Sequence, residues 1–151
     1  MLDEQVHDSG IAIAAEAPIE ITIVMPCLNE ADTLAACVAE ANKNKWAVTI
    51  AIVDDSGAAL LLERLDGCGA IAATVAMGKA QTSALTKRPS KFFEDRVKER
   101  PGFVTFPTPG VMFQGGVPIV HQGECVGAIG VSGVQSHEDE QVAQAGVNAL
   151  G

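Results

Sequence analysis

The sequence predicts one α/β domain built on an antiparallel sheet. Two observations carry this prediction. Two pairs of apolar, Val- and Ile-rich segments are each joined by a short polar turn, a pattern typical of β-hairpins. Four further segments carry apolar residues at helical spacing around these pairs. A chain of 151 residues is the length of one ordinary domain and buries a core without disulfides or metal.

The two hairpins are recognised by their turns. Residues 47–54 are a near-continuous apolar run that predicts a buried strand, and Asp55, Ser56 and Gly57 supply a turn before a second strand at 58–65. The pattern repeats later, where a strand opening at GGVP is followed by a turn at 121–124 and a last strand at 125–131. Hairpins join antiparallel neighbours, so we expect an antiparallel sheet.

Helices are expected on both sides of the hairpins. The first spans 30–44, with Asn29 or Asp32 as its N-cap, and the others span 71–85, 90–98 and 138–150. We expect Ser136 to cap the last of them. The proline-rich segment 101–109 is expected to be a loop or an edge strand, because proline removes a ladder donor. Only 4% of residues are aromatic, so the core is built from small aliphatic side chains that let helices pack closely on a sheet.

Charge excludes two classes of partner. The formal net charge is -9, with 19 acidic against 10 basic residues, so neither nucleic acid nor an anionic membrane is expected to bind. Residues 1–18 are acidic and end at a proline, which predicts a flexible N-terminal arm before a domain at 19–151. They lack the basic start of a secretory signal, so a cytoplasmic location is expected.

Four cysteines are present without a metal-binding pattern. Cys27, Cys37, Cys68 and Cys125 form no C-x-x-C pair and no zinc spacing, so no metal site is predicted. We interpret them as structural thiols in a reducing compartment. The alternative is that Cys68, which has a glycine on each side, is a reactive thiol.

The first third contains a misleading motif. ITIVMPCLNEADTL followed by AIVDDSG resembles the opening of an inverting family-2 glycosyltransferase. The chain that follows is too short for an acceptor half, and no D-x-D follows to hold a metal–diphosphate pair. We therefore interpret Asp54 and Asp55 as turn-forming residues.

Four later blocks point to another family. AIVDDSGAALLLERLDGC, IAATVAMGKAQTSALTKRPSKFF, GGVPIVHQGECVGAIGVSG and SHEDEQVAQAG follow one another from Leu34 onward. In this order and spacing they resemble the GlcG/HbpS family, also called DUF336 or haem-degrading-domain proteins. The resemblance implies a profilin-like α/β/α sandwich and a homo-oligomer, from a dimer up to an octamer. It also implies haem, iron or cobalamin as the ligand of some members, so haem is a possible cofactor.

Polar residues in the middle third are the candidate catalytic and binding groups. Arg64 and Asp66 stand two apart at the end of a strand, either as an ion pair or as an Arg fork for a substrate carboxylate. Lys79 and Thr82 share a face of the 71–85 helix. Lys79 in an apolar helix needs an acidic partner, for which Asp66 is the natural choice, or a ligand. Arg88 near the helix end supplies a second positive contact.

Two further positions complete the candidate site. Gly115 and Gly116 let the backbone approach something closely, either a ligand or a neighbouring subunit. Ser132 ends the last strand and supplies a hydrogen bond. A nucleophilic role would require a base, for which His137 is the neighbour in sequence. Glu138 and Asp139 are interpreted as the acidic first turn of the last helix.

The sequence leaves three functions open. The leading one is binding, with hydrolysis or tautomerisation, of a small anionic carboxylate in a catabolic pathway, where Arg64 anchors the carboxylate and Lys79 or Asp66 transfers protons without a cofactor. The alternative is a haem- or corrinoid-binding protein without turnover. Its candidate axial ligands are His7, His121 and His137. The third is a structural assembly subunit.

Overall fold

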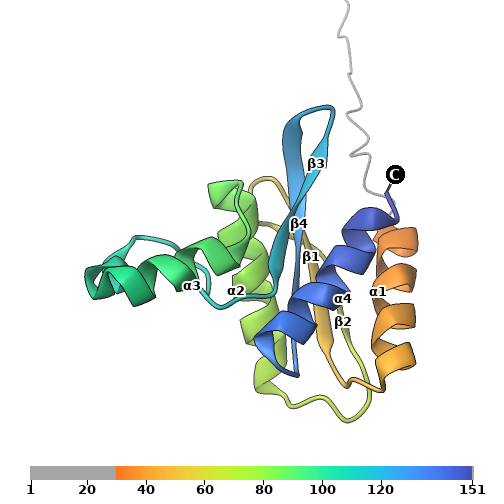
Figure 1. The fold of residues 1–151 in the computed structure, drawn as a ribbon. Helices are drawn as coiled ribbons and strands as arrows, with labels where there is room; N and C mark the ends of the chain where they lie inside the picture. Colours follow the sequence, from red (N-terminus) through yellow and green to blue (C-terminus); the bar gives the residue numbers. More distant parts are fainter. Residues whose placement is uncertain (1–29, 151) are drawn as a thin grey trace, which may run out of the picture.

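The fold is an antiparallel sheet covered by helices on both faces (Figure 1). The computed structural model describes residues 30–150. The strands follow the order β2-β1-β4-β3, and each neighbouring pair is antiparallel, which confirms the predicted sheet. The elements, in chain order, are α1 (Glu30–Asn44), β1 (Thr49–Asp54), β2 (Ala59–Arg64), α2 (Ile71–Thr86), α3 (Ser90–Glu99), the 3-10 helix η1 (Pro101–Thr105), β3 (Gly116–His121), β4 (Glu124–Ser132) and α4 (Ser136–Asn148).

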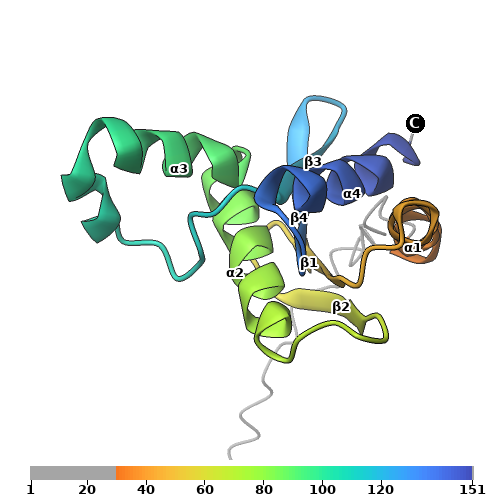
Figure 2. The ribbon, with the colours of Figure 1, turned by 60° about the horizontal axis from the view of Figure 1, so that its bottom comes forward.

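The helices form two layers with different cores (Figure 2). Alternate residues of a strand point to opposite faces of the sheet. Thus Ile50 and Ile52 belong to the aliphatic core beneath α1 and α4, whereas Ala51 and Val53 pack with the alanines of α2. A Cβ at Gly130 would collide with the backbone of α2. The small residues therefore bring α2 very close to the sheet, as the composition predicted.

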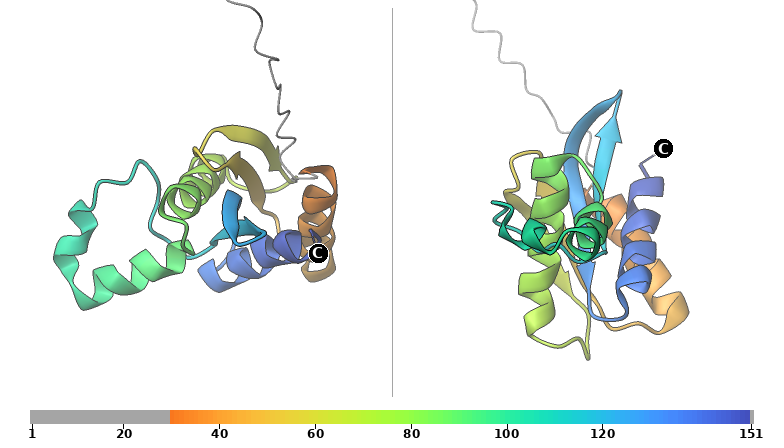
Figure 3. Two further views of the ribbon diagram at one scale, coloured as in Figure 1. Left: turned by 90° about the horizontal axis from the view of Figure 1, so that it is seen from above. Right: turned by 60° about the vertical axis from the view of Figure 1, so that its left-hand side comes forward.

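α3 and η1 project from the sandwich (Figures 1 and 3). We call residues 87–105 the arm; this segment is distinct from the N-terminal arm predicted at 1–18. A cluster of phenylalanines stiffens it: the ring of Phe93 lies 5.2 Å from Phe92 and 5.4 Å from Phe106, and Phe103 stacks on Phe106 at 5.6 Å. The prediction of a loop or edge strand at 101–109 was wrong for its first half, because Pro101 begins η1, where a missing amide hydrogen costs nothing.

Two predicted helix caps need correction. α1 begins at Glu30, so Asp32 lies inside its first turn, and Asn29 falls outside the described residues. α4 begins at Ser136, and its cap is Gln135, which forms a capping box with Glu138. The predicted N-terminal arm 1–18 also lies outside the described residues. Within residues 30–150, no helix has the length and apolarity needed to cross a membrane.

Candidate functional site

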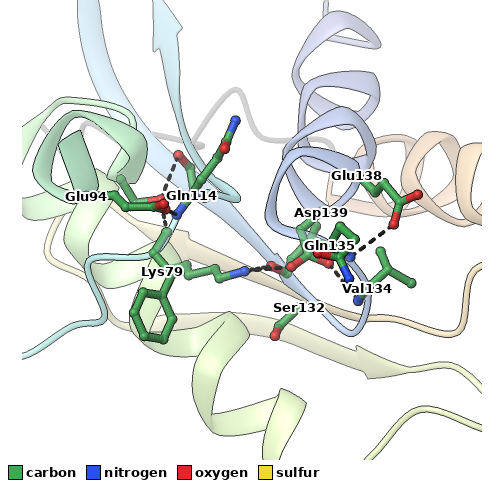
Figure 4. A network of polar contacts seen from close by, with 12 residues as sticks. Lys79, Glu94, Gln114, Ser132, Val134, Gln135, Glu138 and Asp139 are labelled. Atoms are coloured by element: carbon green, nitrogen blue, oxygen red, sulfur yellow. Dashed lines mark hydrogen bonds and ion pairs between the residues drawn. The ribbon is translucent and has the colours of Figure 1, made fainter. Parts of the chain in front are cut away.

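A buried ion pair joins the two helical layers (Figure 4). Lys79 of α2 donates to Oδ2 of Asp139, on α4, at 2.7 Å and to the carbonyl of Val131 at 2.9 Å. Both charged side chains are only 2% exposed. The predicted pairing of Lys79 with Asp66 was therefore wrong, because Asp66 is exposed beyond the end of β2.

The glycines before β3 make room for this pair. Gly115 adopts φ +123°, and a Cβ there would lie 2.9 Å from Lys79 Nζ, from Asp139 Cβ and from the Val131 carbonyl. A Cβ at Gly116 would collide with the backbone of Lys79. Gly115 and Gly116 were predicted to approach a ligand or a neighbouring subunit. The close contacts that the structure shows are instead within one chain, between the start of β3 and its neighbours α2 and α4.

The environment of the pair favours a structural role. Burial raises the pKa of Asp139, and the hydrogen bond and charge of Lys79 oppose that rise. Oδ1 of Asp139 also accepts the amide of Val134 at 3.2 Å. Both charged groups are therefore satisfied within the chain and shielded from water. For Lys79 this geometry favours cross-linking of the layers over proton transfer to a substrate.

Arg64 and Asp66 do not form an ion pair, which was one of the two roles predicted for them. Both side chains are exposed, and neither has an ion-pair partner among residues 30–150. Arg64 lies opposite Thr49 in the sheet, and Thr49 lies opposite Ser132. The thiol of Cys68 contacts this row, 3.4 Å from Thr49 Oγ1. Arg64 is thus available to an anion at the end of the sheet.

The other predicted site residues lie apart. Thr82 is fully buried, with its hydroxyl 3.5 Å from that of Thr108. Arg88 is exposed and lies over the ring of Phe92, 4.7 Å from its centroid. Ser132 is half-buried and makes no hydrogen bond with His137 in the described part of the chain. The predicted residues therefore do not converge on one catalytic centre.

A hollow beside the arm was missed by the sequence analysis. It has a volume of about 500 Å³ and opens between α3, η1 and the segment 106–113. Its lining is mostly aliphatic and aromatic, with Glu94 and Lys98 as the charged members. The signal in the sequence was a set of large apolar residues inside a segment rich in Pro and Gly. The apolar lining residues are Val97, Val104, Phe106, Val111, Met112 and Phe113.

Hydrogen bonds fix one wall of the hollow, the segment 106–113, to α3. Glu94 accepts the amide of Gln114 at 2.7 Å (Figure 4). Burial tends to raise the pKa of Glu94, but this amide and the Lys98 ammonium together hold it below its usual value. Ser90 Oγ donates to the carbonyl of Phe113 at 2.6 Å and accepts the amide of Gly116 at 2.8 Å. The 106–113 segment is thus tied at its end.

The histidines and thiols among residues 30–150 lie away from the hollow, and His7, the third candidate axial ligand, falls outside the described residues. His121 and His137 are exposed, and neither lines it. No group of three or more His, Cys, Asp or Glu side chains is placed to hold a metal ion within residues 30–150. Cys37, Cys68 and Cys125 are free thiols, and burial raises the pKa of Cys37 to about 12. Cys27 lies outside the described residues.

Comparison with known proteins places the chain in a family. The family model described as haem degrading protein HbpS-like matches residues 28–148. Protein GlcG of Escherichia coli K12 is 46% identical over 100 residues, which cover 66% of this chain and 74% of that protein.

Solved structures agree with this assignment. A variant of HbpS from Streptomyces reticuli is 33% identical, with a TM-score of 0.74 over 80% of this chain and 83% of that one. A structure described as a PduOC:Heme complex is 25% identical, with a TM-score of 0.73 over 80% and 90% of the two chains. Protein ORFY of Klebsiella pneumoniae, assigned to DUF336, shares the fold at 23% identity and a TM-score of 0.75, over 82% and 88%. The chain therefore belongs to the GlcG/HbpS family.

Proposed function

We propose that this protein binds haem in the hollow beside α3. The observation that carries the proposal is an apolar, partly aromatic hollow of about 500 Å³ with a lysine in its lining. Ligand sites of this size are typically apolar with a few polar groups that orient the ligand. The family model describes haem-degrading proteins, and one structural relative is a haem complex.

The residues of the hollow suit each part of a haem. Phe106 and Phe113 offer aromatic side chains to an apolar macrocycle. The ammonium of Lys98, which pairs with Glu94 at 2.9 Å, is the positive charge in the lining that a propionate would share. Met112 offers a thioether, one of the axial ligands that proteins use for haem iron. Of the three axial ligands considered from the sequence, His121 and His137 lie outside this lining, and His7 is not among the described residues. Bound haem would supply a redox-active iron, and the lining residues would hold and orient it.

Haemin titration of the purified protein tests the proposal. Val104→Glu puts a carboxylate in the lining of the hollow, and we expect haemin affinity to fall by about tenfold or more, because bound haem would cover this carboxylate and remove it from water. Val120→Glu is the matched control, since Val120 is 59% exposed on β3 and Val104 68% exposed on η1. Met112→Leu should shift the Soret band, and Met77→Leu should leave it unchanged. Equal affinity of Val104→Glu and wild-type protein would refute the site.

A small carboxylate at Arg64 is the second candidate function. The specific observation is an exposed guanidinium without an ion-pair partner in residues 30–150, in register with Thr49 and Ser132. In this alternative Arg64 anchors the carboxylate and Asp66 transfers the proton in hydrolysis or tautomerisation, without a cofactor. Turnover that survives Arg64→Ala in a folded protein would exclude it. In both proposals the protein is a homo-oligomer and is located in the cytoplasm.

A further inference from the structure

A second hollow lies where α1 joins β1. It has a volume of about 330 Å³ and lies between this connection and the residues that follow β2, two segments that Figure 1 shows on the side of the molecule opposite α3. The lining residues are Asn42, Lys45, Trp46, Ala47, Leu65 and Asp66. None of these residues lines the hollow beside α3, so the two hollows are separate.

The end of α1 fixes the two central residues of this lining. Lys45 adopts φ 59°, and its amide donates to the carbonyl of Asn42 at 3.1 Å. The amide of Trp46 donates to the carbonyl of Ala41 at 2.9 Å. These two hydrogen bonds form a Schellman motif, which closes a helix with one left-handed residue. The side chains of Lys45 and Trp46 therefore start from a fixed backbone.

The lining combines apolar side chains with charged ones. Trp46 and Leu65 are half-buried, because each packs against the main core and also lines the hollow. Asn42, Lys45 and Asp66 are exposed to solvent. An apolar surface with a few polar groups beside it suits a small ligand that has one apolar part and one polar part.

The two charges of the lining are opposite and unpaired. Lys45 and Asp66 form no ion pair with each other, and neither has an ion-pair partner in the part of the chain that the structure describes. A simple anion would be attracted by Lys45 but repelled by Asp66, and a simple cation would meet the reverse. A ligand that bears both an ammonium and a carboxylate can satisfy both groups at once.

We propose that this second hollow binds a free α-amino acid with an apolar side chain. Lys45 holds the carboxylate and Asp66 holds the ammonium, while Trp46 and Leu65 contact the side chain. The proposal rests neither on haem binding nor on Arg64. Asp66 acts here as a binding group and transfers no proton.

Titration of the full chain with leucine, followed by the fluorescence of Trp46, tests the proposal. The chain has one tryptophan and no tyrosine, so the emission reports on this hollow. We expect saturable binding with half-saturation at about 1 mM, because exposed charge contacts are weak. Isocaproate, which is leucine without its ammonium, and isoamylamine, which is leucine without its carboxylate, should each bind about fivefold more weakly or worse.

Two substitutions test the two charges separately. Lys45→Asn removes the ammonium and keeps a residue type that tolerates the left-handed conformation, so leucine should bind about fivefold more weakly and no better than isoamylamine. Asp66→Asn should likewise abolish the preference for leucine over isocaproate. Lys43→Asn and Glu63→Gln are the matched controls, because both residues are exposed and lie outside the lining. Both controls should bind leucine like the wild type.

Three results would overturn the proposal. They are a Trp46 signal that does not saturate by about 10 mM leucine, isocaproate that binds as tightly as leucine, and a control variant that binds leucine as weakly as Lys45→Asn. Circular dichroism of each variant checks that it is folded. The Soret band of bound haemin reports on the other hollow, so failure of this proposal and failure of the haem proposal are distinguishable.

Discussion

Removal of one member of the Lys79–Asp139 pair should destabilise the protein strongly. Asp139→Ala leaves the ammonium of Lys79, 2% exposed, with the Val131 carbonyl as its remaining partner. Breaking a buried pair in this way costs about 3–5 kcal/mol. At about 3 °C per kcal/mol for a chain of this size, the melting temperature should fall by about 9–15 °C.

The double variant separates the charge effect from lost packing. Lys79→Met combined with Asp139→Ala removes both charges, so we expect the loss of unfolding free energy to fall to about 1–2 kcal/mol. Urea denaturation of the wild type, both single variants and the double variant measures the coupling directly. Two results would refute the reasoning: a loss of unfolding free energy below about 1 kcal/mol in Asp139→Ala, or a double variant that is no more stable than Asp139→Ala.

Three further predictions follow from the same region and its surroundings. In Lys79→Met, burial keeps the pKa of Asp139 raised, so the folded state of this variant binds a proton more tightly than its unfolded state. The unfolding free energy of Lys79→Met should therefore rise as the pH is lowered from neutral towards about 5. An unfolding free energy that does not change with pH would contradict this. Gly115→Ala should cost about 3 kcal/mol in urea denaturation, because of its positive φ and three contacts at 2.9 Å; a loss below about 1 kcal/mol would argue against this close packing. Iodoacetamide should label Cys68 and Cys125 in the native protein but spare Cys37, whose pKa burial raises to about 12; mass spectrometry of the peptides checks this, and fast labelling of Cys37 would contradict its burial.

The fold was largely predictable because local patterns specify it. Turn residues at Asp55–Gly57 and around Gln122 identified the hairpins, and Ala-rich helical spacing identified α2. η1 was missed because a short 3-10 turn has little periodicity and its proline also suits a loop. Periodicity does not distinguish these two structures.

The candidate site was less predictable because it depends on contacts distant in sequence. Asp139 lies 60 positions from Lys79, and local reasoning assigned it to a helix start rather than to a buried pair. The hollow likewise forms only when residues 106–113 fold back on α3. Sequence spacing identified the unusual buried lysine but not its partner.

Native mass spectrometry of the protein purified from its own host tests the proposed function most directly. Denaturation after the native spectrum releases any bound ligand for identification. The account predicts the mass of haem, with one haem for each chain, and a loss of that mass in Val104→Glu but not in Val120→Glu. A small carboxylate in place of haem, retained by Val104→Glu and lost in Arg64→Ala, would contradict the haem proposal.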